Sequence, residues 1–232
     1  RVVLTDEASR KSLSTVIDTF ENGSAHLSCT VVETDQLSET DHFLVPETPS
    51  DILFLPYTSG STGEPKGVIV SPENVIRNCQ AITHDEPVGV SWLPQFHDMG
   101  MIGYYLFLIV TGGTTYGFSP SDFLRRPVLW FETLSKYNGT ITSAPNFGFE
   151  YCLSERRIPD RALENVDLSS VRIFMNGSEP VSPDAYRRFQ DRFRRYGLEP
   201  QAHAVGYGLA ENTLAVSLGR AGKSLAVDKK EL

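Results

Sequence analysis

Residues 68–93 read VIVSPENVIRNCQAITHDEPVGVSWL. Two apolar runs, Val68–Val70 and Val88–Leu93, flank a stretch that begins with Ser71 and Pro72. A serine hydroxyl caps the first turn of a helix, and proline fits its first position because no backbone donor is needed there. The stretch therefore predicts a strand, a helix and a second strand, which is a β-α-β unit.

The same alternation of apolar runs and helical patterns extends over the rest of the chain. Helices are expected after Pro127, ending in a left-handed turn at Asn138-Gly139, and from Ser182-Pro183 to Gly197. Further strands are expected at Val2–Leu4, Cys29–Val32, Ile52–Leu55, Thr114–Phe118, Thr140–Ser143, Val171–Met175 and Ala202–Val205. The pattern predicts an α/β fold with mainly parallel sheets flanked by helices.

Composition excludes several classes of protein. Of the 232 residues, 40% are hydrophobic and 22% are charged, and this hydrophobic fraction is enough to form a buried core. The 29 acidic and 21 basic side chains give a net charge of −8, which disfavours nucleic acid as a partner. The longest uncharged apolar run, Met99–Val110, is too short for a membrane span, which takes about 20 residues, and is expected to be a buried helix. Cys29, Cys79 and Cys152 are spaced neither as a metal site nor as a disulfide framework, so a cytoplasmic location is expected.

The polar stretch Glu33–Ser50 is the best linker candidate, since it holds Pro46 and Pro49 and lacks a periodic apolar pattern. It predicts a division into a β-α piece with its linker, residues 1–50, and a main body, residues 51–232. The opening of the chain shows no signal sequence, and we expect it to be part of a longer protein.

The stretch Tyr57–Val68, YTSGSTGEPKGV, is the most informative for function. A loop rich in glycine, serine and threonine can turn backbone N–H groups and hydroxyls toward one anion, and Lys66 adds a positive charge, so polyphosphate is the expected ligand. It is not a Walker A loop, because Pro65 precedes the lysine and Gly67 follows it. The alternative is a solvent-exposed hairpin whose glycines serve positive-φ positions.

This loop resembles the phosphate loop of the adenylate-forming superfamily, and four further motifs occur in that family's order. They are SWLPQFHDMGMIG at Ser91–Gly103, SAPNFGFEYC at Ser143–Cys152, NGSEPV at Asn176–Val181 and GYGLAENTLAV at Gly206–Val216. Together they are similar to the fatty acyl-AMP ligase branch, and the resemblance covers most of the chain. It implies part of the large N-terminal domain of such an enzyme, without the family's C-terminal domain.

The resemblance implies a role for each motif. Binding of the ATP phosphates falls to Thr58, Ser59, Gly60, Ser61, Thr62, Gly63 and Lys66. Adenine contacts fall to Asn176, Gly177, Ser178, Glu179, Pro180, Tyr207 and Gly208. His97 is expected beside the substrate carboxylate and the α-phosphate, and Glu211 is expected to bind Mg²⁺. Independently of the resemblance, Asn146 and its aromatic neighbours are candidates for an acyl pocket, although apolar stretches of this kind are more often core.

Each of these residues also has a structural interpretation. A lone histidine near a helix start is more often only hydrogen-bonded there, and the NGSEP segment alone could be an ordinary turn. Gly206-Tyr207-Gly208 begins like a dinucleotide fingerprint, but Glu211 replaces the third glycine, which disfavours an NAD site. The arginines between Arg187 and Arg195 predict a solvated helix face, or a docking surface for an acidic carrier protein.

The function expected from the resemblance is ATP-dependent activation of a fatty acid to an acyl-adenylate, with release of pyrophosphate. Lys66, His97 and Glu211 are the expected catalytic residues, and ATP and Mg²⁺ the expected cofactors. The expected acceptor is an acyl carrier protein or a polyketide synthase. The alternatives are an acyl-CoA synthetase and, from another class, a non-catalytic module of a scaffold protein that binds an acyl group or a nucleotide.

Overall fold

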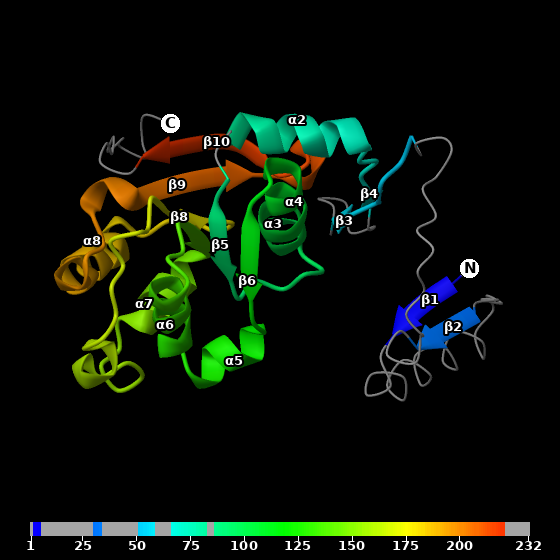
Figure 1. Cartoon of the computed structure of the whole chain (residues 1–232). Helices are drawn as coiled ribbons and strands as arrows, with labels where there is room; N and C mark the ends of the chain where they lie inside the picture. Colours follow the sequence, from blue (N-terminus) through cyan, green and yellow to red (C-terminus); the bar gives the residue numbers. More distant parts are fainter. Residues whose placement is uncertain (1, 6–29, 34–50, 59–65, 83–85, 221–232) are drawn as a thin grey trace, which may run out of the picture. The chain divides into compact units, whose positions relative to one another are not determined.

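The structure, a computed structural model, describes residues 2–5, 30–33, 51–58, 66–82 and 86–220 (Figure 1). Contacts divide the chain into two compact units, Arg1–Pro49 and Ser50–Leu232. In the first unit, β1 (Val2–Thr5) pairs in parallel with β2 (Thr30–Glu33). The predicted linker lies outside the described residues except for its first residue, Glu33.

The second unit is built on a six-stranded sheet of order β10-β9-β8-β7-β5-β6. Its strands are β5 (Val88–Ser91), β6 (Thr114–Gly117), β7 (Ile141–Ala144), β8 (Ile173–Gly177), β9 (His203–Gly208) and β10 (Ala215–Arg220). Every neighbouring pair is parallel except β9 and β10, so the expected mainly parallel sheet is confirmed. The edge strand β10 was not predicted, because its sequence AVSLGR offers only two large apolar residues.

The predicted helices form, with one variation. The helices are α2 (Pro72–Ile82), α3 (Asp98–Gly100), α4 (Phe107–Thr111), α5 (Pro120–Arg125), α6 (Val128–Lys136), α7 (Asn146–Cys152) and α8 (Pro183–Phe193), with a π-helical segment η2 (Met101–Leu106) and 3₁₀ turns η3 (Asp160–Leu163), η4 (Arg194–Tyr196), η5 (Pro200–Ala202) and η6 (Ala210–Asn212). Ser71 and Ser182 accept hydrogen bonds from the first turns of α2 and α8, as predicted. After α6 it is Asn138, at φ 50°, that takes the left-handed conformation, and Gly139 does not.

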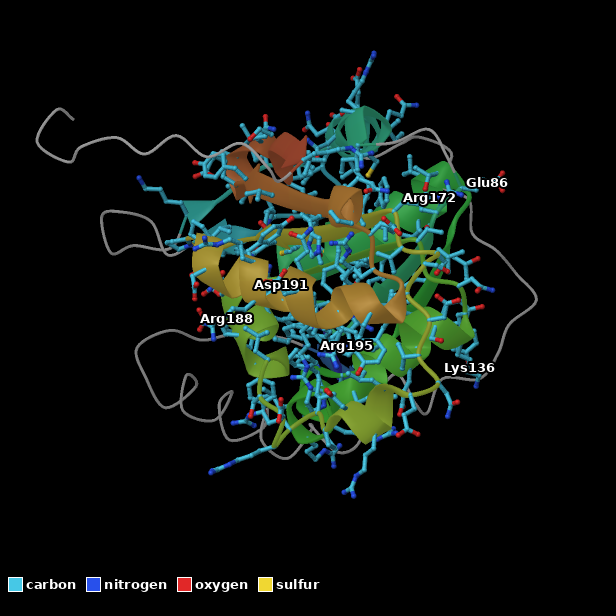
Figure 2. All side chains as sticks on the ribbon, turned by 90° about the vertical axis from the view of Figure 1, so that its left-hand side faces the viewer. Glu86, Lys136, Arg172, Arg188, Asp191 and Arg195 are labelled. Carbon is cyan, nitrogen blue, oxygen red and sulfur yellow. The ribbon has the colours of Figure 1, made fainter. Side chains whose placement is uncertain are left out.

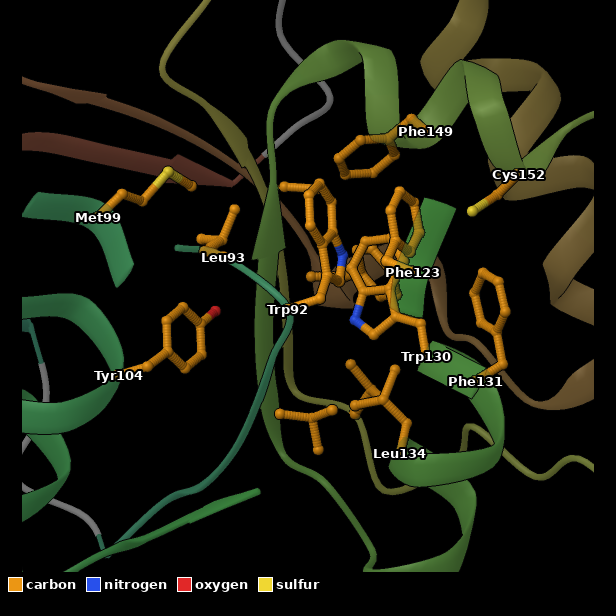
Figure 3. Close-up of a cluster of buried hydrophobic side chains, with 14 of the residues drawn as sticks. Trp92, Leu93, Met99, Tyr104, Phe123, Trp130, Phe131, Leu134, Phe149 and Cys152 are labelled. Atoms are coloured by element: carbon orange, nitrogen blue, oxygen red, sulfur yellow. The ribbon is translucent and has the colours of Figure 1, made fainter. Parts of the chain in front are cut away.

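The two faces of the sheet carry different layers. On one face, Phe174 of β8 contacts the rings of Trp130, Phe149 and Phe189, which come from α6, α7 and α8. Because side chains alternate along a strand, the neighbours of Phe174 point to the other face, where α3, η2 and α4 form one continuous helical run. Figure 3 shows Met99 and Tyr104 of that run across the strands from the aromatic cluster. His97 and Gly177 lie on this second face, whereas Asn146 belongs to α7 on the first.

The segments on either side of the phosphate loop form an antiparallel hairpin. β3 (Tyr57–Thr58) pairs with β4 (Lys66–Gly67), and a single bridge joins Phe54 to Val70 farther out. The strands predicted at Ile52–Leu55 and Val68–Val70 are therefore wrong in extent. Proline has no N–H to donate, and Pro56 interrupts the ladder between the two paired regions, where only its carbonyl accepts from Val68.

No helix among residues 2–5, 30–33, 51–58, 66–82 and 86–220 is long and apolar enough to cross a membrane. Met99–Val110, predicted to be a buried helix, is helical but not buried all round. Ile102 and Phe107 are buried, whereas Ile109 is 76% exposed, because only one face of the run packs on the sheet.

Candidate active site

A cavity of about 380 Å³ lies between the sheet and the helical run 98–111. Its sheet wall follows alternate residues, with Ile173, Met175 and Gly177 on β8 and Ala204 and Gly206 on β9. Small residues keep this wall open. A Cβ at position 177 would lie 2.8 Å from the Gly206 carbonyl oxygen, which cannot move aside, and one at position 206 would displace the flexible Met175 side chain, whose sulfur would lie 2.6 Å away. A hollow therefore runs along the strands and ends at their carboxyl edge, where ligands bind in open α/β sheets.

His97 lines this cavity at the start of the helical run. Its Nδ1 lies 2.7 Å from the Oδ1 of Asp98 and 3.2 Å from the backbone nitrogen of Met99. One nitrogen cannot donate to the carboxylate and accept from the amide at once, and the amide has a closer acceptor in the same Oδ1, at 2.7 Å. Nδ1 therefore carries the proton, and the hydrogen bond to Asp98 raises the pKa of His97 above its ordinary value. The other ring nitrogen, Nε2, remains for a ligand.

The helical run widens into a π-helical turn where it faces the cavity. The backbone N–H of Phe107 donates to Ile102, five residues earlier, and Gly103 and Tyr104 of this turn line the cavity. The Tyr104 hydroxyl donates to Ser143 of β7 at 2.8 Å, and burial raises the pKa of the phenol. Sequence reasoning missed this buried pair, because nothing in a plain apolar run marks a π-turn.

The predicted adenine segment begins inside a strand and not after it. Asn176 and Gly177 belong to β8, and Ser178 follows at φ 72°, a left-handed conformation that is rare outside glycine. The Ser178 hydroxyl donates to the sulfur of Met99 at 2.7 Å, which connects this segment to α3, the helix that begins directly after His97. Gly177 and Ser178 line the first cavity.

Asn176 and Glu179 of this segment form hydrogen bonds away from the first cavity. Asn176 is fully buried and donates to Asn146 at 3.1 Å, and its Oδ1 has no partner within the described part of the chain. Glu179 accepts from the backbone N–H of Phe147 at the start of α7, at 2.5 Å. Neither Glu179 nor Pro180 lines the first cavity or the second cavity around Glu211. Their part in adenine binding stays a prediction.

Tyr207 and Gly208, at the end of β9, both line the first cavity. Tyr207 is 60% exposed, so its ring is open to a stacking partner. Gly208 must be glycine, because a Cβ there would lie 2.2 Å from the carbonyl oxygen of Leu214 in the turn that follows.

Glu211 lies in a second cavity of about 450 Å³, lined also by Val68, Ile69, Asn78 and Asn212. Ala215 lines both cavities, so the two adjoin at that residue. The second cavity thus lies between the segment that follows β4 and the turn that carries Glu211.

Thr58 and Lys66 are the described residues at the two ends of the phosphate loop. Ser59, Gly60, Ser61, Thr62 and Gly63 lie outside the described residues. Thr58 and Lys66 are directly opposite each other in the hairpin, so the loop is closed at its base. Lys66 is exposed and lines neither cavity, but Val68, two residues later, lines the second.

Asn146 has a structural role. Its Oδ1 accepts from Asn176 and from the backbone N–H of Ser182, and its Nδ2 donates to Glu150. These hydrogen bonds connect α7, β8 and the start of α8. Asn146 lines neither cavity. Its place in an acyl pocket stays a prediction.

The arginine-rich helix α8 is only partly the solvated face that its sequence predicts. Arg188 pairs with Asp184 at 2.9 Å on the exposed side. Figure 2 shows Arg188 and Asp191 on that helix and Arg195 on the 3₁₀ turn η4 that follows it. Arg192 differs, because its side chain is only 10% exposed. Its guanidinium donates to the carbonyls of Cys152 and Ile158 and pairs with Asp160 at 3.3 Å, so it fastens the segment after α7 to α8.

The donor set near Glu211 fits magnesium only together with a phosphate. No group of three metal-ligating His, Cys, Asp or Glu side chains occurs among the residues that the structure describes. Mg²⁺ is commonly held in proteins by one or two carboxylates plus substrate phosphates and water. The Glu211 carboxylate in an open cavity matches that arrangement.

Comparison with known proteins identifies the family of the chain. A family model described as AMP-binding enzyme matches residues 1–230. A medium-chain-fatty-acid–acyl-carrier-protein ligase of Teredinibacter turnerae is 39% identical over 192 residues, which covers 79% of this chain and 30% of that protein. A ligase of the same description from Moorena producens is 38% identical over 188 residues, covering 78% of this chain and 31% of that protein. The chain thus spans less than a third of the length of these two relatives.

Solved structures give the same result. A structure from a study of the fatty acyl-adenylate ligases of E. coli and L. pneumophila matches with a TM-score of 0.80 and 35% identity, over 94% of this chain and 39% of that one. The L. pneumophila ligase in complex with acyl adenylate and pyrophosphate matches with a TM-score of 0.77 and 34% identity, over 94% of this chain and 38% of that one. The chain belongs to the family of AMP-binding enzymes, and its fold is that of their adenylate-forming N-terminal domain.

Proposed function

We propose that the protein activates a fatty acid with ATP, forming an acyl-adenylate and pyrophosphate. The observation that carries the proposal is the first cavity, in which an apolar hollow along β8 and β9 ends beside His97, Ser178 and Tyr207. The apolar hollow is suited to an acyl chain. Its polar end is suited to the carboxylate of that chain and to a nucleotide. The two ligase relatives act on medium-chain fatty acids by description, which supports the same class of substrate here.

In the reaction a carboxylate oxygen attacks the α-phosphorus of ATP, and the bond from that phosphorus to the pyrophosphate oxygen breaks. Two anions must approach each other, so catalysis depends on positioning and on fixed positive charge. His97 is placed to supply such charge, because Asp98 holds Nδ1–H and favours the protonated ring. Tyr207 stacks on adenine, and Lys66 with the loop Ser59–Gly63 binds the departing phosphates.

Glu211 would hold Mg²⁺ against the phosphates from the second cavity. When bound, the ion neutralises the charge that develops on the pyrophosphate oxygens. Asn212 and Ala210 flank Glu211 in a 3₁₀ turn, so the carboxylate is presented from a short, internally hydrogen-bonded segment.

The proposed acceptor of the acyl group is an acyl carrier protein, free or within a polyketide synthase. The descriptions of the two relatives support a carrier protein over coenzyme A. An acyl-CoA synthetase remains the alternative, and a full-length protein that releases acyl-CoA as readily as it loads the carrier would contradict our choice. We also expect the protein to act in the cytoplasm, because the buried thiols Cys79 and Cys152 are free.

Pyrophosphate exchange with the full-length protein tests the first half-reaction. The wild-type protein should exchange labelled pyrophosphate into ATP only when a fatty acid is present. We expect Lys66→Ala to raise the KM for ATP and Glu211→Ala to raise the Mg²⁺ requirement, whereas Lys136→Ala, a lysine on α6, should change neither. Unchanged kinetics in both site variants would contradict the assignment.

A non-catalytic module makes a different prediction. It would bind ATP or an acyl-adenylate analogue in calorimetry and would show no exchange at any fatty-acid concentration. Binding without exchange in the full-length protein would therefore favour the module.

A further inference from the structure

Thr213, two residues after Glu211, has an unusual backbone conformation. Its φ is 70° and its ψ is −61°, and the N–H of Leu214 donates to the carbonyl of Asn212 at 2.8 Å. These values define the γ-turn of positive φ, which is rare and strained. A β-branched residue such as threonine disfavours positive φ further. Such a conformation persists only where the surroundings hold it in place.

The side chain of Asn78 on α2 holds this turn from outside. Its Nδ2 donates to the carbonyl oxygens of Asn212 at 3.2 Å and of Ala215 at 2.9 Å. Its Oδ1 accepts from the backbone N–H of Ala215 at 3.0 Å. One amide therefore binds the backbone on both sides of Thr213. Only an amide satisfies this set, because two partners are acceptors and the third is a donor.

The helix that carries Asn78 is held in place by its packing and its N-terminal cap. The same helix buries Val75 and Cys79, and its first turn is fixed by reciprocal hydrogen bonds between Ser71 and Asn74. The helix is more than 130 residues away from the turn in sequence, so its hydrogen bonds are tertiary contacts. The turn thus takes its position from α2 and not from its own sequence alone.

The γ-turn is continuous with the segment that presents Glu211. The N–H of Thr213 donates to Ala210 at 2.9 Å, and the N–H of Asn212 donates to Leu209 at 3.1 Å, which closes the 3₁₀ turn around Glu211. Asn78 and Glu211 also line the same cavity. If Thr213 relaxed to negative φ, the chain direction would change immediately after the 3₁₀ turn, and the carboxylate would move with it.

We infer that Asn78 is a positioning residue for adenylation, which acts by holding the strained turn at Thr213 and thereby directs the Glu211 carboxylate toward its cavity. The inference rests on the proposed function for its kinetic consequence. Its structural part, the dependence of the turn on Asn78, stands by itself. Asn78 lines the second cavity and not the first, where the acyl chain would lie, so its effect should be confined to the metal and phosphate side.

Asn78→Asp tests this in the full-length protein, since the variant keeps the shape and one acceptor but cannot donate to the two carbonyls. Loss of an outer residue that orients a metal ligand typically costs 10–100-fold in metal affinity or activity. We therefore expect the Mg²⁺ concentration for half-maximal pyrophosphate exchange to rise about tenfold or more, with the KM for fatty acid unchanged. Gln80→Ala, at an exposed position of the same helix, is the matched control.

A second substitution separates positioning from general damage. Glycine adopts positive φ at little cost, so adding Thr213→Gly to Asn78→Asp should restore much of the Mg²⁺ response. A crystal structure of the Asn78→Asp variant, which needs no activity, should show residue 213 out of its positive-φ turn. An unchanged turn together with an unchanged Mg²⁺ response would overturn the inference. If wild type and Gln80→Ala both lack exchange, the proposed function fails instead, and the crystallographic result still decides the structural part.

Discussion

The protonation of His97 is set by one neighbouring side chain. Asp98 lies 2.7 Å from Nδ1 and fixes the tautomer, while the backbone N–H of Met99 is satisfied by the same carboxylate. The motif HDMG predicts His97 as a site residue through its resemblance to a family. Only the three-dimensional structure tells which nitrogen carries the proton, because that depends on distances between atoms of adjacent residues.

Asp98→Asn should shift the pH dependence of acyl-adenylate formation. The hydrogen bond to Asp98 raises the pKa of His97, so the cationic ring persists to higher pH and is lost as pH rises through that raised pKa. In the variant the pKa falls, and the alkaline decline in rate should begin at lower pH. Rates measured from about pH 5 to 9, which brackets the ordinary histidine pKa, with an NMR titration of His97, check this, and Asp191→Asn on α8 is the control. Superimposable profiles would show that His97 does not act as a cation.

The helical run 98–111 is positioned by a close contact between backbones. The carbonyl oxygen of Pro94 accepts from the N–H of His97 at 3.2 Å and lies against Gly100. A Cβ on Gly100 would be 2.1 Å from that oxygen, closer than atoms can approach. Glycine at position 100 lets the helix pack directly against the Pro94–His97 turn. This packing places His97 at the rim of the cavity.

Gly100→Ala should therefore destabilise the protein and displace His97 together. Overpacking of this kind typically costs about 1–3 kcal/mol, and a backbone carbonyl oxygen cannot move aside as a flexible side chain can. Gly219→Ala on β10 should stay within about 0.5 kcal/mol of wild type, since nothing lies within 4 Å of its added Cβ. Urea unfolding of both variants makes the comparison. A Gly100→Ala protein as stable as Gly219→Ala would mean that the run is free to shift.

The sheet and its outer helix layer meet around a buried histidine. His203 opens β9, is fully buried, and packs against the rings of Tyr186, Phe174 and Phe189. Neither of its ring nitrogens has a hydrogen-bond partner within the described residues. Burial lowers the pKa of His203 from 6.5 to about 4, so the ring stays neutral in the folded protein. The contact between sheet and α8 thus depends on an uncharged imidazole.

Acid should weaken the whole fold through this residue. Between about pH 6.5 and 4 the unfolded chain binds a proton at His203 that the folded protein does not, so the free energy of unfolding falls as pH falls. The loss approaches on the order of 3 kcal/mol below about pH 4. His203→Phe should flatten this part of the stability curve, whatever its effect at neutral pH. Chemical denaturation at several pH values measures the slope, and equal slopes in both proteins would contradict the prediction.

The sequence alone determined the fold class, the helices at Pro72 and Pro183, and the candidacy of His97, Tyr207 and Glu211. The fold class and the helices follow from local rules, since capping and hydrophobic periodicity are written within a few residues of each other. The three site candidates follow from the resemblance of their motifs to a known family. The ends of the strands beside Pro56 and the existence of the edge strand β10 depend on backbone pairing with other segments. A short stretch of sequence does not encode that pairing.

Only the tertiary structure decided how the candidate residues are grouped. It brought His97, Ser178 and Tyr207 to one cavity and Glu211 to an adjoining one, and it turned Asn146 and Glu179 to structural contacts. It also joined Asn78 to the turn at Thr213. The physical reason is that side-chain hydrogen bonds and close backbone contacts form between segments far apart in sequence, and their geometry exists only once the sheet has assembled.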